Sequence, residues 1–287
     1  MSVTAAKKFK KKLATGVVAP GAWNALVARL IVKVGYQAVY VSGGATANSC
    51  GVPDIGLLTR VEFIKKIKQI TESVDVPVIA DADTGYENTP NTVRGFSEAG
   101  AIALHIEDQV FPKRCGHLDG KELIKKQDMG KKVLDAKKAA PHDDFMIIAR
   151  TDARGVTGLD DAIERANYYR SMGADMIFPE GLVSFSEFKI FAKESPGFLL
   201  ANMTEFGKSD LLTHKQLFDI GYNLIIHPVT TQRVAMFSIE LFLKSLLETG
   251  DVSTNLHKMQ TREDLYKLLS YKPNESWDVL KSKNKIS

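Results

Sequence analysis

The strongest constraint on the fold is an alternation of short, apolar, β-branched runs with longer amphipathic runs. This pattern is typical of repeated strand–helix units that build a parallel sheet. Strands are predicted over residues 16–19, 37–42, 76–83, 102–107, 145–152, 175–180, 198–204 and 223–229. Between them the pattern predicts helices, for example over 22–34, 60–73, 92–99, 159–172, 215–220 and 232–247.

Several predicted helices end at a glycine that leads into the next strand, namely Gly35, Gly100, Gly173 and Gly221. Glycine enters the left-handed conformation that ends a helix without steric cost, so these positions mark a repeating unit. Eight such units predict a TIM-type (β/α)8 barrel of the α/β class. An open, doubly wound sheet is the competing architecture, but it normally has only about six strands.

Domain organisation follows from where the repeat stops. We expect residues 1–250 to form the barrel, and 251–287 to form an additional C-terminal helical extension. The extension is too apolar for a disordered tail, so we expect it to pack on the barrel or on another subunit. Its apolar residues include Leu265, Tyr266, Leu268, Leu269, Tyr271, Trp277 and Leu280.

Composition excludes several classes of protein. Hydrophobic residues make up 44% of the 287 and charged residues 25%, which is typical of globular domains and not of disordered or coiled-coil chains. The 38 basic and 34 acidic residues give a net charge of +4, too small to indicate nucleic-acid binding. Basic residues concentrate in 7–12 and 281–285, which we interpret as solvated tails.

Localisation is inferred from what the sequence lacks. No stretch approaches the roughly 20 apolar residues of a membrane span, and no signal-peptide pattern is present. The two cysteines, Cys50 and Cys115, form at most one disulfide. We therefore expect a reduced, cytoplasmic protein.

Acidic residues follow two neighbouring predicted strands. In a barrel the carboxyl ends of the strands meet at one mouth, so Asp81, Asp83 and Glu107 are predicted to lie together, with Asp54 on a preceding loop. Carboxylates this close repel one another unless a cation neutralises them, which favours Mg²⁺ held by a few carboxylates and waters. The alternative is that they are strand-end and turn residues that pair with Arg150 or cap helices.

The sharpest local motif is Lys113-Arg114-Cys115-Gly116-His117. A thiol surrounded by basic groups has a lowered pKa and can act as an acid, a base or a nucleophile. The alternative is an ordinary exposed cysteine in a basic loop. No C-x-x-C zinc pattern accompanies it.

Other polar residues at strand ends are suited to bind an acidic small molecule. The planar guanidinium of Arg150 is suited to bind a carboxylate through two hydrogen bonds, and Glu180 can orient it. Neutral donors are predicted at Ser42, Gly43, Gly44, Asn202 and Thr204. No nucleotide-binding glycine pattern and no G-x-S-x-G elbow follows a strand, which argues against nucleotide binding and an α/β-hydrolase.

Taken together, these motifs resemble the isocitrate lyase and phosphoenolpyruvate mutase superfamily, in order and over nearly the whole chain. The motif around Cys115 resembles the carbon–carbon lyase branch, because the phosphoryl mutases lack this cysteine. The matching strings are Ser42-Gly43-Gly44, Val52-Pro53-Asp54, Asp81-Ala82-Asp83, His105-Ile106-Glu107-Asp108, Lys113-Arg114-Cys115-Gly116-His117, Ala149-Arg150-Thr151-Asp152, Phe178-Pro179-Glu180 and Asn202-Met203-Thr204.

The resemblance implies Mg²⁺-dependent cleavage of 2-methylisocitrate into pyruvate and succinate, the carbon-splitting step of propionate breakdown by the methylcitrate cycle. It implies Cys115 as the catalytic acid, Tyr40 as the candidate base and Arg150 as the third catalytic residue. The implied metal shell is Asp54, Asp81, Asp83 and Glu107. The implied substrate-binding positions are Ser42, Gly43, Gly44, Lys113, Gly116, His117, Glu180, Asn202 and Thr204.

The resemblance leaves the substrate open between 2-methylisocitrate, isocitrate and 2,3-dimethylmalate, with a phosphonopyruvate-type mutase or hydrolase as the more distant alternative. Phe178 and Ile226 are expected to accept the extra methyl group, which contributes only about 1–3 kcal/mol of discrimination. His227 departs from the tyrosine expected in bacterial relatives. A homotetramer with exchanged C-terminal helices is also implied.

Overall fold

The computed structural model describes residues 3–114, 116, 118, 120–272 and 274–279. All eight predicted strands are present, each pairing in parallel with its neighbours, so the predicted strand pattern is confirmed. The strands are β1 Val17–Pro20, β2 Val39–Val41, β3 Val78–Asp81, β4 Ala103–Glu107, β5 Met146–Thr151, β6 Met176–Pro179, β7 Leu200–Asn202 and β8 Leu224–His227.

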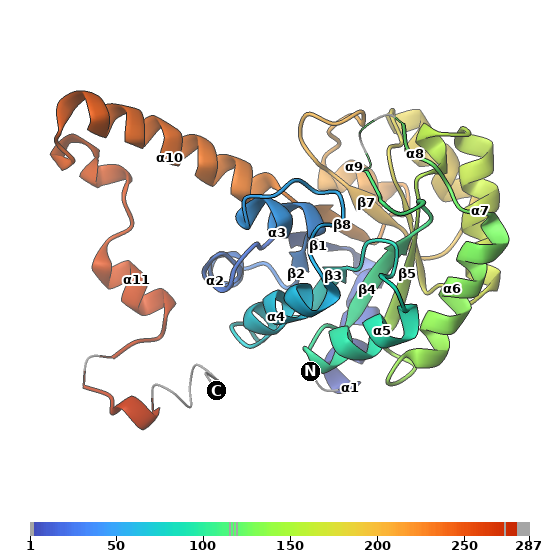
Figure 1. The fold of residues 1–287 in the computed structure, drawn as a ribbon, viewed down its shortest axis with the longest axis horizontal. Helices are drawn as coiled ribbons and strands as arrows, with labels where there is room; N and C mark the ends of the chain where they lie inside the picture. Colours follow the sequence, from blue (N-terminus) through green and yellow to red (C-terminus); the bar gives the residue numbers. More distant parts are fainter. Residues whose placement is uncertain (1–2, 115, 117, 119, 273, 280–287) are drawn as a thin grey trace.

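The strands close into a barrel (Figure 1). β2 to β6 form one sheet in sequence order, and β1, β8 and β7 form a second. Single parallel bridges join the two sheets at both seams, between Gly21 and Tyr40 and between Ile177 and Leu199. The predicted TIM-type barrel is therefore confirmed, and the open doubly wound sheet is excluded.

Helices follow the strands around the outside of the barrel. Gly35, Gly100, Gly173 and Gly221 all have positive φ angles, between 95° and 105°, as expected of residues that end a helix in a left-handed turn. The helices from β1 to β8 are α2 Ala25–Lys33, α3 Gly43–Ser49, α4 Arg60–Thr71, α5 Thr89–Glu98, α6 Lys126–Ala139, α7 Leu159–Ser171, α8 Phe185–Glu194 and α9 His214–Asp219.

The first helix, α1 Val3–Lys12, corrects one prediction. Residues 7–12 are not a solvated tail, because Ala6, Phe9 and the following Leu13 are buried in the cluster that fills the barrel interior. Their spacing places them on one face of a helix, while Lys7 and Lys8 remain exposed. Residues 281–285 lie outside the described residues.

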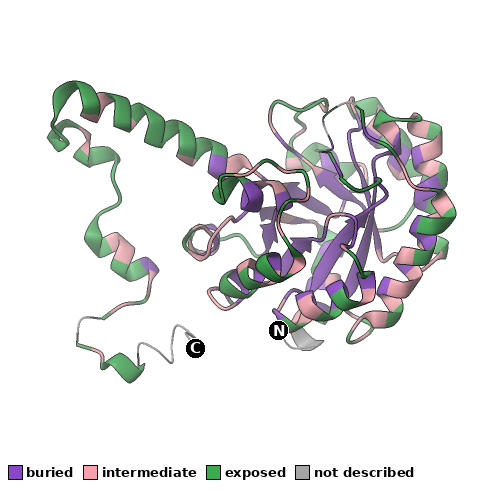
Figure 2. Ribbon diagram, in the orientation of Figure 1, coloured by how far each residue is buried: buried purple, intermediate pink, exposed green. Residues whose placement is uncertain are grey.

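The C-terminal segment begins with α10 Thr230–Thr249, which extends away from the barrel (Figure 1). Most of α10 is exposed (Figure 2). After η3 Ser253–Lys258, helix α11 Arg262–Leu268 returns to α2, where Leu268 is buried and its carbonyl accepts a hydrogen bond from Arg29 at 3.4 Å. No helix in the described ranges is both long and apolar enough to cross a membrane.

Phe9→Ala is expected to lower the free energy of unfolding by about 3–5 kcal/mol, because it leaves a cavity in the barrel interior. Guanidinium unfolding at fixed protein concentration measures the change. Lys8→Ala, on the exposed side of α1, serves as the control and is expected to change stability by less than about 0.5 kcal/mol. Equal effects of the two substitutions would contradict the assignment of Phe9 to the core.

Candidate active site

A cavity of about 150 Å³ lies at the carboxyl ends of the strands. It brings together residues that are far apart in the sequence, as the strand-end argument predicts. Of the predicted site residues, it is lined by Tyr40, Ser42, Gly44, Asp54, Asp81, Gly116, Arg150, Glu180, Asn202 and Thr204. Phe178 and Ile226, the residues predicted to accept a methyl group, also line it.

Helix α3 begins immediately after β2 and places its first turn against the acidic residues. The Ser42 hydroxyl caps the helix by accepting a hydrogen bond from the Ala45 amide at 3.2 Å. The Gly43 amide donates to Asp81 Oδ2 at 3.0 Å. A Cβ atom at Gly43 would lie 2.7 Å from that oxygen, so a larger residue would displace the Asp81 carboxylate from this hydrogen bond.

Lys113 forms ion pairs with two of the four predicted metal ligands. Its ammonium lies 2.5 Å from Asp54 Oδ1 and 2.7 Å from Asp83 Oδ1. Burial raises the pKa of Asp83 to about 6, and the charges of Asp81 and Asp54 act in the same direction against the opposing charge of Lys113. Asp83 also has a left-handed backbone, with φ of 46°.

Glu107 is the most deeply buried of the four predicted metal ligands. It is fully buried, and neither carboxylate oxygen has a hydrogen-bond partner within the described structure. Burial raises its pKa well above the ordinary value, although Arg150 and Lys113 oppose this shift. An anion in this position is stabilised only by a nearby positive charge.

The acidic residues at the strand ends are candidate ligands for a metal ion. Among the described side chains, no group of three or more His, Cys, Asp or Glu residues forms a ready-made metal cluster. Mg²⁺ does not require one, because it commonly binds through one or two carboxylates and keeps several waters. The all-carboxylate donor set fits such an ion, as do the buried oxygens of Glu107, which accept no hydrogen bond from the described residues.

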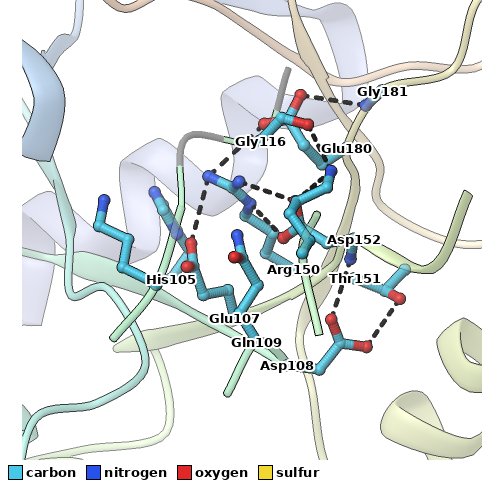
Figure 3. Close-up of polar contacts among 12 residues, drawn as sticks. His105, Glu107, Asp108, Gln109, Gly116, Arg150, Thr151, Asp152, Glu180 and Gly181 are labelled. Carbon is cyan, nitrogen blue, oxygen red and sulfur yellow. Dashed lines mark hydrogen bonds and ion pairs between the residues drawn. The ribbon is translucent and has the colours of Figure 1, made fainter. Parts of the chain in front are cut away.

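Arg150 is the central cation of the site (Figure 3). Its Nε and Nη2 donate to the two carboxylate oxygens of Asp152, each at 3.0 Å. Its Nη1 lies 3.3 Å from Glu107 Oε2 and 3.5 Å from Glu180 Oε2. The guanidinium also lies 5.2 Å from the centre of the Phe178 ring, which adds a cation–π contact.

Strand register explains this convergence. Glu107 pairs with Arg150 across β4 and β5, and Arg150 pairs with Phe178 across β5 and β6. The Asn202 amide then donates to Glu180 Oε2 at 3.2 Å. Glu180 therefore contacts both the guanidinium and the amide, and it orients both toward the cavity.

Asp108 binds the two residues that follow Arg150 in the chain, Thr151 and Asp152 (Figure 3). This buried carboxylate accepts hydrogen bonds from the Thr151 hydroxyl at 2.8 Å and the Asp152 amide at 2.9 Å. The Tyr169 hydroxyl of α7 also donates to it, at 2.8 Å. The sequence analysis assigned no role to Asp108, because its partners come from separate elements.

Tyr40 and His105 form a neutral pair beneath the cavity. The Tyr40 hydroxyl lies 2.6 Å from His105 Nε2. Burial, followed by the charge of Asp81, raises the pKa of Tyr40 well above its ordinary value. Burial lowers the pKa of His105 to about 4. The surroundings therefore favour a neutral phenol, and the predicted role of Tyr40 as a base stays a prediction.

The loop after β4 reaches this cavity at Gly116. Cys115 and His117 lie outside the described residues, so their predicted roles rest on the sequence. Gly116 does line the cavity, and a Cβ atom there would lie 2.4 Å from Arg150 Nη2 and 2.5 Å from Glu180 Cγ. Only glycine allows the loop backbone to approach Arg150 and Glu180 so closely.

Two polar residues that line the cavity were missed by the sequence analysis. Arg233 lies in the first turn of α10, after the end of β8, and Asn48 lies in the second turn of α3, after the end of β2. Both follow their strands by about two helical turns, so residues at that distance from each strand end are also candidates for the site. His227 points elsewhere, because its Nε2 lies 2.9 Å from His214 Nε2 and the residue does not line this cavity.

The fold and the site define a (β/α)8-barrel enzyme with its cavity at the carboxyl ends of the strands. Residues 8–247 match the phosphoenolpyruvate phosphomutase family. The chain therefore belongs to the phosphoenolpyruvate mutase and isocitrate lyase family.

Individual relatives are similar over most of their length. The 2-methylisocitrate lyase of Aeropyrum pernix is 47% identical over 266 residues, which cover 92% of this chain and 86% of the relative. The crystal structure of a 2,3-dimethylmalate lyase has a TM-score of 0.87 and 32% identity, covering 93% of this chain and 92% of that one. A phosphonopyruvate hydrolase in complex with oxalate and Mg²⁺ shares the fold, with a TM-score of 0.84 and 24% identity over 93% of this chain and 95% of its own.

Tyr169→Phe is expected to lower the free energy of unfolding by about 1–3 kcal/mol, because Asp108 loses a buried donor. Chemical denaturation measures the effect. Tyr168→Phe on the same helix is the matched control, since its hydroxyl has no hydrogen bond to any part of the chain that the structure describes. A control as destabilised as Tyr169→Phe would contradict the role given to the Asp108 contact.

Proposed function

We propose that the protein is a carbon–carbon lyase that cleaves 2-methylisocitrate into pyruvate and succinate. The observation that carries this proposal is the cavity itself, where Arg150 and Glu180 lie with the acidic residues Asp54 and Asp81, and which Gly116 of the Lys113–His117 motif also lines. Such a cavity is suited to a substrate with several carboxylates. The name of the Aeropyrum pernix relative supports this choice of substrate.

Asp54, Asp81, Asp83 and Glu107 are the residues that would hold Mg²⁺ in this proposal. When bound, the ion would supply Lewis-acid stabilisation to substrate oxygens that gain negative charge. The fit rests on the all-carboxylate donor set and on the buried oxygens of Glu107, which accept no hydrogen bond from the described residues although Arg150 lies 3.3 Å away. Asp81 contributes an oxygen already oriented by the Gly43 amide.

Substrate binding is assigned to groups that are held in place before the substrate arrives. Arg150 is fixed by Asp152, so its planar guanidinium is ready to bind a carboxylate. Asn202 is oriented by Glu180, and the hydroxyl groups of Ser42 and Thr204 add neutral donors on the cavity wall. Arg233 supplies a further positive charge at the rim.

Proton transfer is assigned to two residues, the Cys115 thiol and the hydroxyl group of Tyr40, which lines the cavity. Cleavage of the carbon–carbon bond leaves one product as a carbanion that must take up a proton. Cys115 is proposed to donate that proton to the succinate carbanion, since its basic neighbours stabilise the thiolate left behind. Tyr40 remains the candidate base for the substrate hydroxyl, and its bond to His105 positions the phenol.

The second candidate is a lyase acting on 2,3-dimethylmalate, supported by the similar solved structure with that name. Both substrates are compatible with the apolar wall of Phe178 and Ile226. A phosphonopyruvate-type reaction is less favoured, because the Lys113–His117 motif contains the cysteine typical of carbon–carbon lyases.

Pyruvate release from 2-methylisocitrate, isocitrate and 2,3-dimethylmalate tests the proposal. With Mg²⁺ present, we expect turnover of 2-methylisocitrate to exceed that of the others, and EDTA to abolish it. Cys115→Ser should lower kcat by at least about 100-fold by removing the acid, and Cys50→Ser, at an exposed free cysteine, should not. No cleavage of any of the three would refute the lyase, and full activity of Cys115→Ser would refute the acid.

We also propose that α10 pairs with a second copy of the chain in a homotetramer, and that the extension from 251 onward belongs to this interface. An apolar groove of about 710 Å³ on α10 is lined by residues including Met236, Phe237, Ile239 and Leu243, with Phe206 beside them. Such a surface is unfavourable in water and suits another apolar helix. The exposed free Cys50 is consistent with the reducing cytoplasm as the proposed location.

Leu243→Glu is expected to reduce the assembly to smaller species, because it places a charge in the proposed interface. Size-exclusion chromatography with light scattering measures the mass. Thr249→Glu adds the same charge at the end of α10, outside the groove, and should leave the mass unchanged. A monomeric wild-type protein would contradict the proposed tetramer directly.

A further inference from the structure

Lys121 is a buried lysine outside every helix and strand. Its side chain is only 2% exposed, and its ammonium donates to Asp152 Oδ1 at 3.0 Å. The same ammonium also donates to the backbone carbonyl of Gly116. Lysine is almost never fully buried unless it is paired, so this contact is a specific feature of the loop.

Asp152 is shared between Lys121 and the substrate-binding arginine. It is fully buried and binds both Nε and Nη2 of Arg150. The backbone amide of Asp152 is held in turn by Asp108. One carboxylate therefore connects Lys121 to the guanidinium that faces the cavity.

Gly116 is the point where the loop meets that guanidinium. A Cβ atom at this position would overlap Arg150 and Glu180, so the backbone is packed directly against both side chains. The carbonyl of Gly116 is bonded to Lys121, which fixes this peptide from the other side. Lys121 and Asp152 therefore link the Gly116 peptide to the guanidinium of Arg150.

We propose that Lys121 is a positioning residue that holds the Gly116 segment against Arg150 and Glu180 by pairing with Asp152. This inference rests on the proposed function for its consequence, since the same segment carries the residues assigned to proton transfer. Arg150 makes its own two hydrogen bonds to Asp152, neither of which involves Lys121, so we expect the barrel to keep them when Lys121 is replaced. The effect is therefore expected at the loop.

Lys121→Met tests the proposal, because methionine keeps an unbranched side chain without the charge. The control is Lys125→Met, at an exposed lysine just before α6. Each variant removes one trypsin site, so the two are matched for limited proteolysis. We expect Lys121→Met to lower kcat/KM for pyruvate release about 100-fold, mostly through kcat, because a small misplacement of reacting groups has effects of this size.

Limited trypsin digestion of the protein alone tests the positioning without using activity. In Lys121→Met, cleavage after the exposed Arg114 is expected to be about tenfold faster than in Lys125→Met, because a charged hydrogen bond no longer restrains the loop. Cleavage after Lys208, in the loop that follows β7, should not change. Lys121→Gln keeps a donor for the Gly116 carbonyl, is expected to fall between the two, and serves if Lys121→Met does not fold.

The outcomes separate this inference from the proposed function. Unchanged cleavage after Arg114 would overturn the positioning role, as would equal acceleration at Arg114 and Lys208, which indicates general destabilisation. A wild-type protein without lyase activity would refute the function, while the digestion would still decide the role of Lys121. Selective cleavage after Arg114, together with the loss in kcat, supports both.

Discussion

The buried ion pair between Arg150 and Asp152 is the interaction on which the arrangement of the site depends. Both residues lie at the end of β5, and their geometry is set by two hydrogen bonds of 3.0 Å. Removing either partner would leave the other buried charge without its two-hydrogen-bond partner, which is unfavourable. The carboxylates of Glu107 and Glu180 then lie around a guanidinium whose position is already determined.

Close backbone approach is the second constraint. Gly43 allows α3 to begin directly against Asp81, and Gly116 allows the loop after β4 to pack on Arg150 and Glu180. A side chain at either position would push apart groups that have to lie within hydrogen-bonding distance. The site therefore depends on glycine at these two positions as much as on its charged side chains.

Much of the site was predictable because a barrel places the carboxyl ends of its strands at one mouth. Asp81, Glu107, Arg150 and Glu180 each lie within the last three residues of a predicted strand, and the structure brings them together. The supporting groups were not predictable in this way. Asp108 binds Tyr169 from α7, a partner 61 residues away, and no local pattern indicates such a pair.

The sequence by itself determined the alternation of strands and helices, the glycines that end those helices, and the residue types at the strand ends, because these follow from local periodicity and backbone conformation. Only the tertiary structure decided that Phe9 fills the barrel interior and that Lys121 is buried against Asp152. Basic side chains beside an apolar residue are equally compatible with a solvated helix. Whether such a residue is buried depends on which distant elements surround it, and that is settled only when the barrel closes.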